Sequence, residues 1–111
     1  MITSGAGGDT IDSGLGNDIV NAGAGDDLIV LDLGNDTIDG GAGIDTLDAS
    51  ADTALVVVDL SITAAQNTRQ GIDTISNIEN LIGTDFNDTL RGDAGVNVIN
   101  GGGGILSLIH I

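Results

Sequence analysis

A nine-residue repeat organises the N-terminal half of the chain. Cut every nine residues from Ser4 to Asp48, the sequence reads SGAGGDTID, SGLGNDIVN, AGAGDDLIV, LDLGNDTID and GGAGIDTLD. Every unit has glycine in its fourth place, aspartate in its sixth and an aliphatic residue in its eighth. The aliphatic residues are Ile11, Val20, Ile29, Ile38 and Leu47. A fixed period of this kind is typical of stacked repeat architectures.

Within each unit the first six residues are typical of a turn and the last three of a short strand. Because side chains alternate along a strand, the eighth-place residues are expected to face inward as one file. One three-residue strand buries nothing alone, so the units must stack into a solenoid, with eighteen residues in one circuit. Residues 1–3 fit the last three places of a preceding unit, which predicts that the natural protein begins upstream of Met1.

Stacking places the sixth-place aspartates in two columns, Asp9, Asp27 and Asp45 on one edge and Asp18 and Asp36 on the other. Neighbouring carboxylates in a column would be separated by roughly the 4.7 to 4.9 Å spacing of strands. At that distance they repel by about 3 to 4 kcal/mol at an effective dielectric near 20. The columns therefore indicate a cation as the missing partner.

Composition limits what that partner can be. The chain carries 17 acidic residues against two arginines, no lysine and a formal charge of -15, which excludes nucleic acid as a partner. It has no cysteine, and its single histidine is His110, so a zinc site is excluded. Calcium accepts six to eight oxygen ligands at flexible angles, whereas magnesium demands strict octahedral geometry. Carboxylates and turn carbonyls thus favour calcium.

The units resemble G-G-x-G-x-D-x-U-x, the RTX or haemolysin-type calcium-binding nonapeptide, closely over residues 4–48 and more weakly over residues 83–104. The resemblance implies an all-β fold, a right-handed parallel β-roll or β-solenoid, with Ca2+ between turns two repeats apart. It implies ions between Asp9 and Asp27, between Asp27 and Asp45, and between Asp18 and Asp36. The full set of expected metal ligands is Asp9, Asp18, Asp27, Asp36, Asp45 and Asp88, with carbonyls of Gly5, Gly7, Gly14, Gly16, Gly23, Gly25, Gly41 and Gly43.

Where a unit departs from the pattern, its calcium site is expected to be weaker. Leu31 and Asp32 open the fourth unit where two glycines are usual, so the Asp18–Asp36 site is expected to be weaker than the column through Asp27. In the second block Phe86 replaces the fourth-place glycine and Asn97 the sixth-place aspartate, so calcium occupancy is expected to fall there.

The chain is expected to divide into four parts. Residues 1–48 form the calcium-binding repeats, residues 49–82 an irregular spacer in the same solenoid, and residues 83–105 a second, degenerate block. In the spacer, residues 55–60 and 72–82 are expected to be strands and residues 63–70 an exposed excursion. Residues 106–111, LSLIHI, break the pattern and match a translated transposon adapter used in DNA library preparation, which predicts a non-native tail.

No catalytic residue is predicted, because the lone histidine lies in the suspect tail and the aspartate columns are explained by calcium. The resemblance implies a secreted, extracellular bacterial module that folds on binding calcium and supports export by a type I secretion apparatus. The alternative is the repeat portion of an exported protease, lipase, polysaccharide epimerase, adhesin or cytolysin. No apolar run is long enough for a membrane span, and the uncapped ends of the roll predict possible end-to-end self-association.

Overall fold

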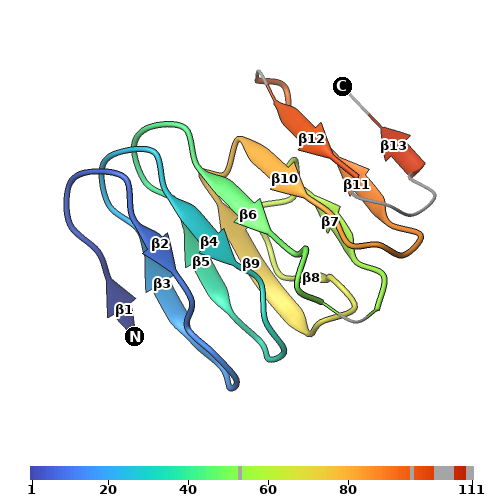
Figure 1. Ribbon diagram of the computed structural model, residues 1–111, viewed down its shortest axis with the longest axis horizontal. Helices are drawn as coiled ribbons and strands as arrows, with labels where there is room; N and C mark the ends of the chain where they lie inside the picture. Colours follow the sequence, from blue (N-terminus) through green and yellow to red (C-terminus); the bar gives the residue numbers. More distant parts are fainter. Residues whose placement is uncertain (53, 96, 102–106, 110–111) are drawn as a thin grey trace.

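Short strands stack along the chain to form a two-layered roll in the computed structural model, which describes residues 1–52, 54–95, 97–101 and 107–109 (Figure 1). One sheet has the order β1-β3-β5-β9-β8, a second β12-β10-β6-β4-β2, and a third β13-β11-β7. All pairings are parallel except that of β8 with β9. The described residues form no helix that could cross a membrane. The fold is therefore the expected all-β parallel β-roll.

The strands of the three sheets have the following bounds. The first sheet holds β1 (Ile2–Thr3), β3 (Ile19–Asn21), β5 (Thr37–Asp39), β9 (Ile72–Ser76) and β8 (Gln66–Asn67). The second holds β2 (Thr10–Ile11), β4 (Leu28–Val30), β6 (Thr46–Asp48), β10 (Asn80–Ile82) and β12 (Val98–Asn100). The third holds β7 (Val57–Asp59), β11 (Thr89–Arg91) and β13 (Ser107–Ile109).

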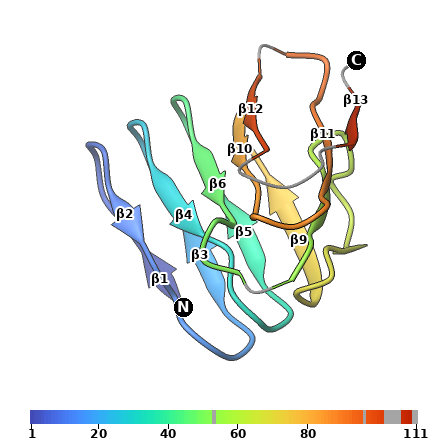
Figure 2. The same cartoon turned by 45° about the vertical axis from the view of Figure 1, so that its right-hand side comes forward.

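Pairing between strands repeats every eighteen residues through the N-terminal half, as the sequence predicts. Ile2 pairs with Val20 and Val20 with Ile38, whereas Thr10 pairs with Leu28 and Leu28 with Thr46. Successive units thus alternate between the two layers, and Figure 2 shows β2, β4 and β6 in one layer and β3, β5 and β9 in the other.

The core lies between the layers and consists of an inward-facing file of aliphatic side chains together with other buried aliphatic residues such as Leu31, Val56 and Leu60. The eighth-place residues of the five units are at most 5% exposed, as their inward alternation predicts: Ile11, Val20, Ile29, Ile38 and Leu47. Ile75, Leu81 and Leu90 extend this file into the C-terminal half. Because no aromatic residue contributes to the core, each aliphatic side chain accounts for a large share of the buried apolar surface.

Part of the spacer turns out to contain another repeat unit. Residues 68–76, TRQGIDTIS, carry Gly71, Asp73 and Ile75 in the fourth, sixth and eighth places, and Ile75 pairs with Ile38. The expected exposed excursion over residues 63–70 is wrong at its end, where Thr68 is 0% and Gln70 7% exposed. Their burial follows from the turn they form, in which the Gln70 carbonyl accepts the Gly34 amide at 3.0 Å.

A shortened unit follows at once, over residues 77–82. Its strand β10 continues the second sheet, with Leu81 paired to Leu47. Only Asn77 and Ile78 separate the end of β9 from Glu79, where a complete turn has five residues. Asn77 has the left-handed φ of 54° that asparagine tolerates better than most residues. The strands expected over residues 72–82 are confirmed as β9 and β10.

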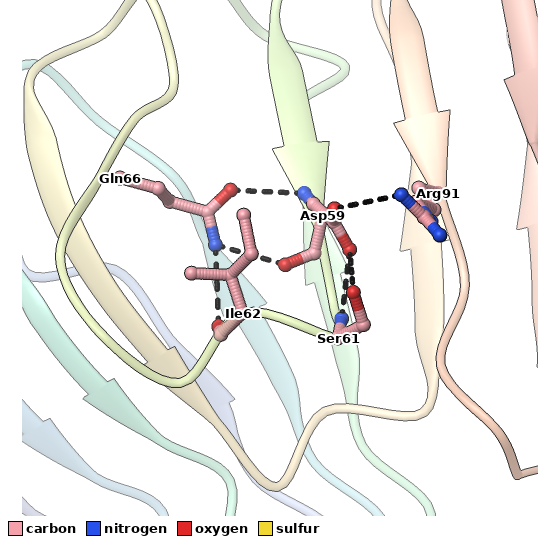
Figure 3. Close-up of polar contacts among 5 residues, drawn as sticks. All are labelled: Asp59, Ser61, Ile62, Gln66 and Arg91. Atoms are coloured by element: carbon pink, nitrogen blue, oxygen red, sulfur yellow. Dashed lines mark hydrogen bonds and ion pairs between the residues drawn. The ribbon is translucent and has the colours of Figure 1, made fainter.

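The first part of the spacer pairs with a strand that follows it in the chain. Strand β7, the core of the strand expected over residues 55–60, lies beside β11 and not beside the N-terminal repeats. Figure 3 shows the polar contacts that fix it: the Asp59 amide donates to Gln66 Oε1 at 2.9 Å, and Gln66 Nε2 donates to the Asp59 carbonyl at 2.9 Å. The Asp59 carboxylate also forms an ion pair with Arg91 at 3.7 Å. A local cation thus neutralises this carboxylate.

At the C-terminal end, β13 pairs with β11 and extends the third sheet. Residues 106, 110 and 111 of the predicted non-native tail lie outside the described residues. The four-part division of the chain, including that tail, stays a prediction.

Aspartates in the ninth place close the strands. Asp12, Asp39 and Asp48 each accept a hydrogen bond from the amide two residues later, at 2.8 to 3.0 Å. This is the Asx turn, in which a side chain replaces a backbone carbonyl. Each of these acids therefore begins the turn that follows its strand.

The thin core predicts a large effect for one truncation. Replacing Ile29 (1% exposed) by alanine should lower the free energy of unfolding by about 3 kcal/mol, from lost transfer energy and a residual cavity. Chemical denaturation in calcium measures the change. Leu15→Ala is the control, because Leu15 is 80% exposed and its truncation should cost less than about 0.5 kcal/mol. Equal losses in the two variants would contradict the inward file.

Candidate metal centre

The sixth-place aspartates form hydrogen-bonded columns along the roll. In the first column the Asp9 amide donates to Asp27 Oδ1 at 2.8 Å, and the Asp27 amide donates to Asp45 Oδ1 at 2.9 Å. Each carboxylate therefore binds the backbone of the preceding coil. The repeat makes this possible because strand pairing holds residues eighteen apart directly above one another.

The second column has the same geometry on the opposite edge. The Asp18 amide donates to Asp36 Oδ1 at 2.9 Å, and the Asp36 amide donates to Asp73 Oδ1 at 2.7 Å. The structure thus brings together the aspartates that the sequence assigned to each column. It also adds Asp73 to the second column and Glu79 to the first, since the Asp45 amide donates to Glu79 Oε2 at 2.8 Å.

Each column leaves carboxylate oxygens without a partner. Oδ2 of Asp18, Asp27 and Asp45 is shielded from solvent and accepts no hydrogen bond from the protein. Asp27 and Asp45 are only 2% and 0% exposed as whole residues. A buried charge without a partner is strongly unfavourable, so these oxygens require a ligand or a proton.

Carbonyl oxygens of the turns line the same columns. At Gly43, where φ is 115°, a Cβ would lie 2.0 Å from the Gly25 carbonyl oxygen, and at Gly41 it would lie 2.0 Å from that of Gly23. In the same way, the Gly7 carbonyl oxygen would lie 2.4 Å from a Cβ at Gly25, and the Gly5 carbonyl oxygen 2.4 Å from a Cβ at Gly23. Only glycine permits this approach, and each carbonyl keeps a lone pair even where it accepts one amide.

The second edge is less regular. The Gly16 carbonyl faces Gly34, a residue not included among the expected ligands, and the Gly34 carbonyl faces Gly71 in turn. Asp32 replaces glycine above Gly14, and burial and a hydrogen bond with Asp12 raise its pKa. The structure therefore supplies fewer stacked carbonyls on this edge.

Two expected ligands have an internal partner. Ser4 Oγ donates to Asp9 Oδ2, and Thr84 donates to both oxygens of Asp88, through its hydroxyl at 2.7 Å and its amide at 2.8 Å. In the coil beside Asp88 the sixth place is held by Val56, whose amide donates to Asp88 Oδ1 at 3.0 Å. Asp88 therefore lies apart from the other expected ligands.

A hollow of about 380 Å³ borders the first column on its outer side. Asp9, Asp27 and the outward seventh-place residues Leu28 and Thr46 contribute to its wall. Because Oδ2 of Asp27 and Asp45 is shielded from solvent, this hollow is a surface feature beside the column and gives no open path to those oxygens.

Charge and burial act on the proton affinity of the columns. Burial, followed by the charges of Asp27 and Glu79, raises the pKa of Asp45 to about 6. Burial is also the main cause that raises the pKa of Asp36, with the charges of Asp73 and Asp18 adding to it. Burial is thus the larger cause of both raised pKa values, and repulsion between neighbouring carboxylates adds to it.

The donor set fits a hard cation. Among the described residues no three acidic or histidine side chains converge on a point where they could hold a metal by themselves. A cation bound to these carboxylates would need further oxygens from backbone carbonyls or water, and the stacked glycines offer carbonyls in the same turns. Calcium accepts such all-oxygen sets of mixed carboxylates and carbonyls.

Comparison with known families identifies the repeat. A model of the RTX calcium-binding nonapeptide repeat matches the chain in four copies, over residues 3–38, 13–47, 32–53 and 73–105. No curated protein matches the chain. The fourth copy begins at Asp73, the aspartate that the structure adds to the second column.

The raised pKa of Asp45 predicts a pH dependence in the absence of calcium. The folded state binds this proton more tightly than the unfolded state does, so folding is favoured below a pH of about 6 and disfavoured as the pH rises through that value. In chelator, strand content measured by circular dichroism should increase between pH 7 and about 5. In Asp45→Asn the increase should be smaller; a strand content that rises with pH would contradict the assignment.

Proposed function

The chain belongs to the RTX calcium-binding nonapeptide repeat family, and on that premise we propose that its sixth-place aspartates and turn carbonyls bind calcium and couple binding to folding. RTX nonapeptide repeats bind Ca2+ and are structural modules. The observation that carries the proposal is the set of shielded, unpartnered Oδ2 atoms on Asp18, Asp27 and Asp45.

We assign one ion to each neighbouring pair of turns: Asp9 with Asp27, Asp27 with Asp45, and Asp18 with Asp36. The carbonyls of Gly5, Gly7, Gly23, Gly25, Gly41 and Gly43 complete the sites of the first column, and those of Gly14 and Gly16 contribute to the second. The stacked glycines support the first column more strongly. Asp88 is the weakest member of the proposed set, because Thr84 already satisfies its oxygens.

Coupled folding follows from the charge balance. Bound calcium supplies the positive charge that offsets the repulsion within each column. Without it, the chain must bring unpartnered carboxylates together at a net charge of -15, with only a thin aliphatic core to compensate. The calcium-binding free energy then becomes folding free energy.

Such coupling suits an exported protein. A chain unfolded at low calcium can pass through a type I secretion channel and then fold at the higher calcium concentration outside the cell. We therefore propose an extracellular, secreted location and a role in secretion for the parent protein. Absence of catalysis in this segment is part of the proposal, because the family is a structural module.

The second candidate is that these residues are the repeat portion of an exported protease, lipase, polysaccharide epimerase, adhesin or cytolysin.

The short exposed ends of the roll also favour end-to-end self-association, because edge strands have unpaired backbone groups. Reading the gene on both sides of these codons tests the first point, and sedimentation in calcium tests the second.

Calcium titration followed by circular dichroism tests the proposal directly. The chain should show little strand signal in chelator and a cooperative increase as calcium approaches the millimolar range. Magnesium at the same concentration is the control and should produce a much smaller change, since it dehydrates reluctantly. Identical spectra in chelator and in calcium would refute coupled folding.

A pair of neighbouring variants tests the ligand assignment. Asp27→Asn removes one charge from the first column and should weaken calcium binding by about tenfold or more. Asp26→Asn is the matched control, because the adjacent Asp26 is exposed and only accepts the Ile44 amide at 2.8 Å, which an asparagine oxygen can still do. Isothermal titration calorimetry gives both affinities. Equal losses in the two variants would show an effect of net charge alone.

A further inference from the structure

The first aspartate column continues beyond the nonapeptides, into a segment that has no complete repeat. Pairing of β10 with β6 places Glu79 above Asp45. The Asp45 amide donates to Glu79 Oε2 at 2.8 Å, matching the 2.8 and 2.9 Å bonds that link the column below. Glu79 therefore occupies the sixth place of the shortened unit over residues 77–82.

Two oxygens, the Asn77 carbonyl and Asp45 Oδ2, lie close to the position that a side chain of residue 40 would occupy. A Cβ at Gly40 would lie 2.2 Å from the Asn77 carbonyl oxygen and 2.7 Å from Asp45 Oδ2. Asn77 holds its carbonyl there because its φ of 54° turns the chain sharply before Glu79. The absence of a side chain at residue 40 thus leaves a small hollow bounded by a carbonyl and a carboxylate oxygen.

Asp45 has no protein partner for the oxygen that faces this hollow. The residue is 0% exposed, and its Oδ2 accepts no hydrogen bond. Other sixth-place acids in the C-terminal half are satisfied internally: Thr68 donates to Asp73 Oδ2 at 2.5 Å, and Thr84 donates to Asp88. Gly40, in the first place that Thr68 holds in its own unit, offers no hydroxyl. Asp45 therefore needs a partner from outside the chain.

We propose that Asp45, Glu79 and the Asn77 carbonyl form an additional calcium site at the junction between the fifth repeat and the shortened unit. The site rests on the proposed function, since it extends the same column. It differs in its ligands, because the turn above Asp45 lacks three residues and their carbonyls, and a longer glutamate replaces the aspartate. Binding there joins the repeats to the segment that follows them.

Counting bound ions tests the junction site. Equilibrium dialysis of the full chain against calcium should give about one ion fewer per chain for Glu79→Gln than for the unchanged protein. Glutamine keeps an oxygen that can accept the Asp45 amide, so the variant removes the charge and preserves the hydrogen bond. Asp48→Asn is the matched control, since it also removes one charge but keeps the Asx turn to Ser50, and should bind the full number.

The outcomes separate the two proposals. Calcium binding by the unchanged protein, with an equal number of ions and equal affinity in Glu79→Gln, would overturn the junction site and leave the proposed function intact. No calcium binding by the unchanged protein would overturn both. If Glu79→Gln loses its strand signal in calcium, the variant Glu79→Asp is measured in its place. Its shorter carboxylate should lower the calcium affinity of the junction site by about tenfold. An unchanged affinity would overturn the site.

Discussion

The hydrogen bond from each coil's backbone amide to the carboxylate of the next coil is the interaction on which the rest of the roll depends. It fixes the register of successive turns, as between Asp27 and Asp45, where the amide and Oδ1 are 2.9 Å apart. The same bond brings carboxylates into columns, where their charges repel. The contact that aligns the coils therefore brings negative charges together, and the stacked glycine carbonyls place further oxygen atoms in the same turns.

The C-terminal half meets part of this demand with its own groups. Thr68 and Thr84 donate hydroxyls to Asp73 and Asp88, and Arg91 pairs with Asp59 at 3.7 Å. Directly before β7 the sixth place is held by Val56, so the carboxylate column does not continue from Asp88 into that coil. Among the described residues, the buried aspartate oxygens without a partner are accordingly concentrated in the N-terminal repeats, with Asp52 just beyond them. One solenoid thus combines coils of two chemical kinds without a change of architecture.

Much of this arrangement could be predicted from the repeat. A period of nine with fixed glycine, aspartate and aliphatic places implies both the eighteen-residue circuit and the two columns. Asp73 was missed although GIDTIS matches the second half of a unit, because an insertion shifts it out of register with Gly43. Glu79 carried less signal still, since its unit lacks three turn residues and has asparagine where glycine is usual.

The sequence by itself determined the local alternation of turn and strand, the inward aliphatic file and the chemistry of the cation, because each depends on residue types at short, constant spacing. Only the tertiary structure decided which coil follows the fifth repeat. Strands β9 and β10 reach back to β5 and β6, whereas β7 pairs ahead with β11. Such choices depend on long-range pairing across a variable insertion, and no local period encodes them. That pairing is what places Glu79 above Asp45.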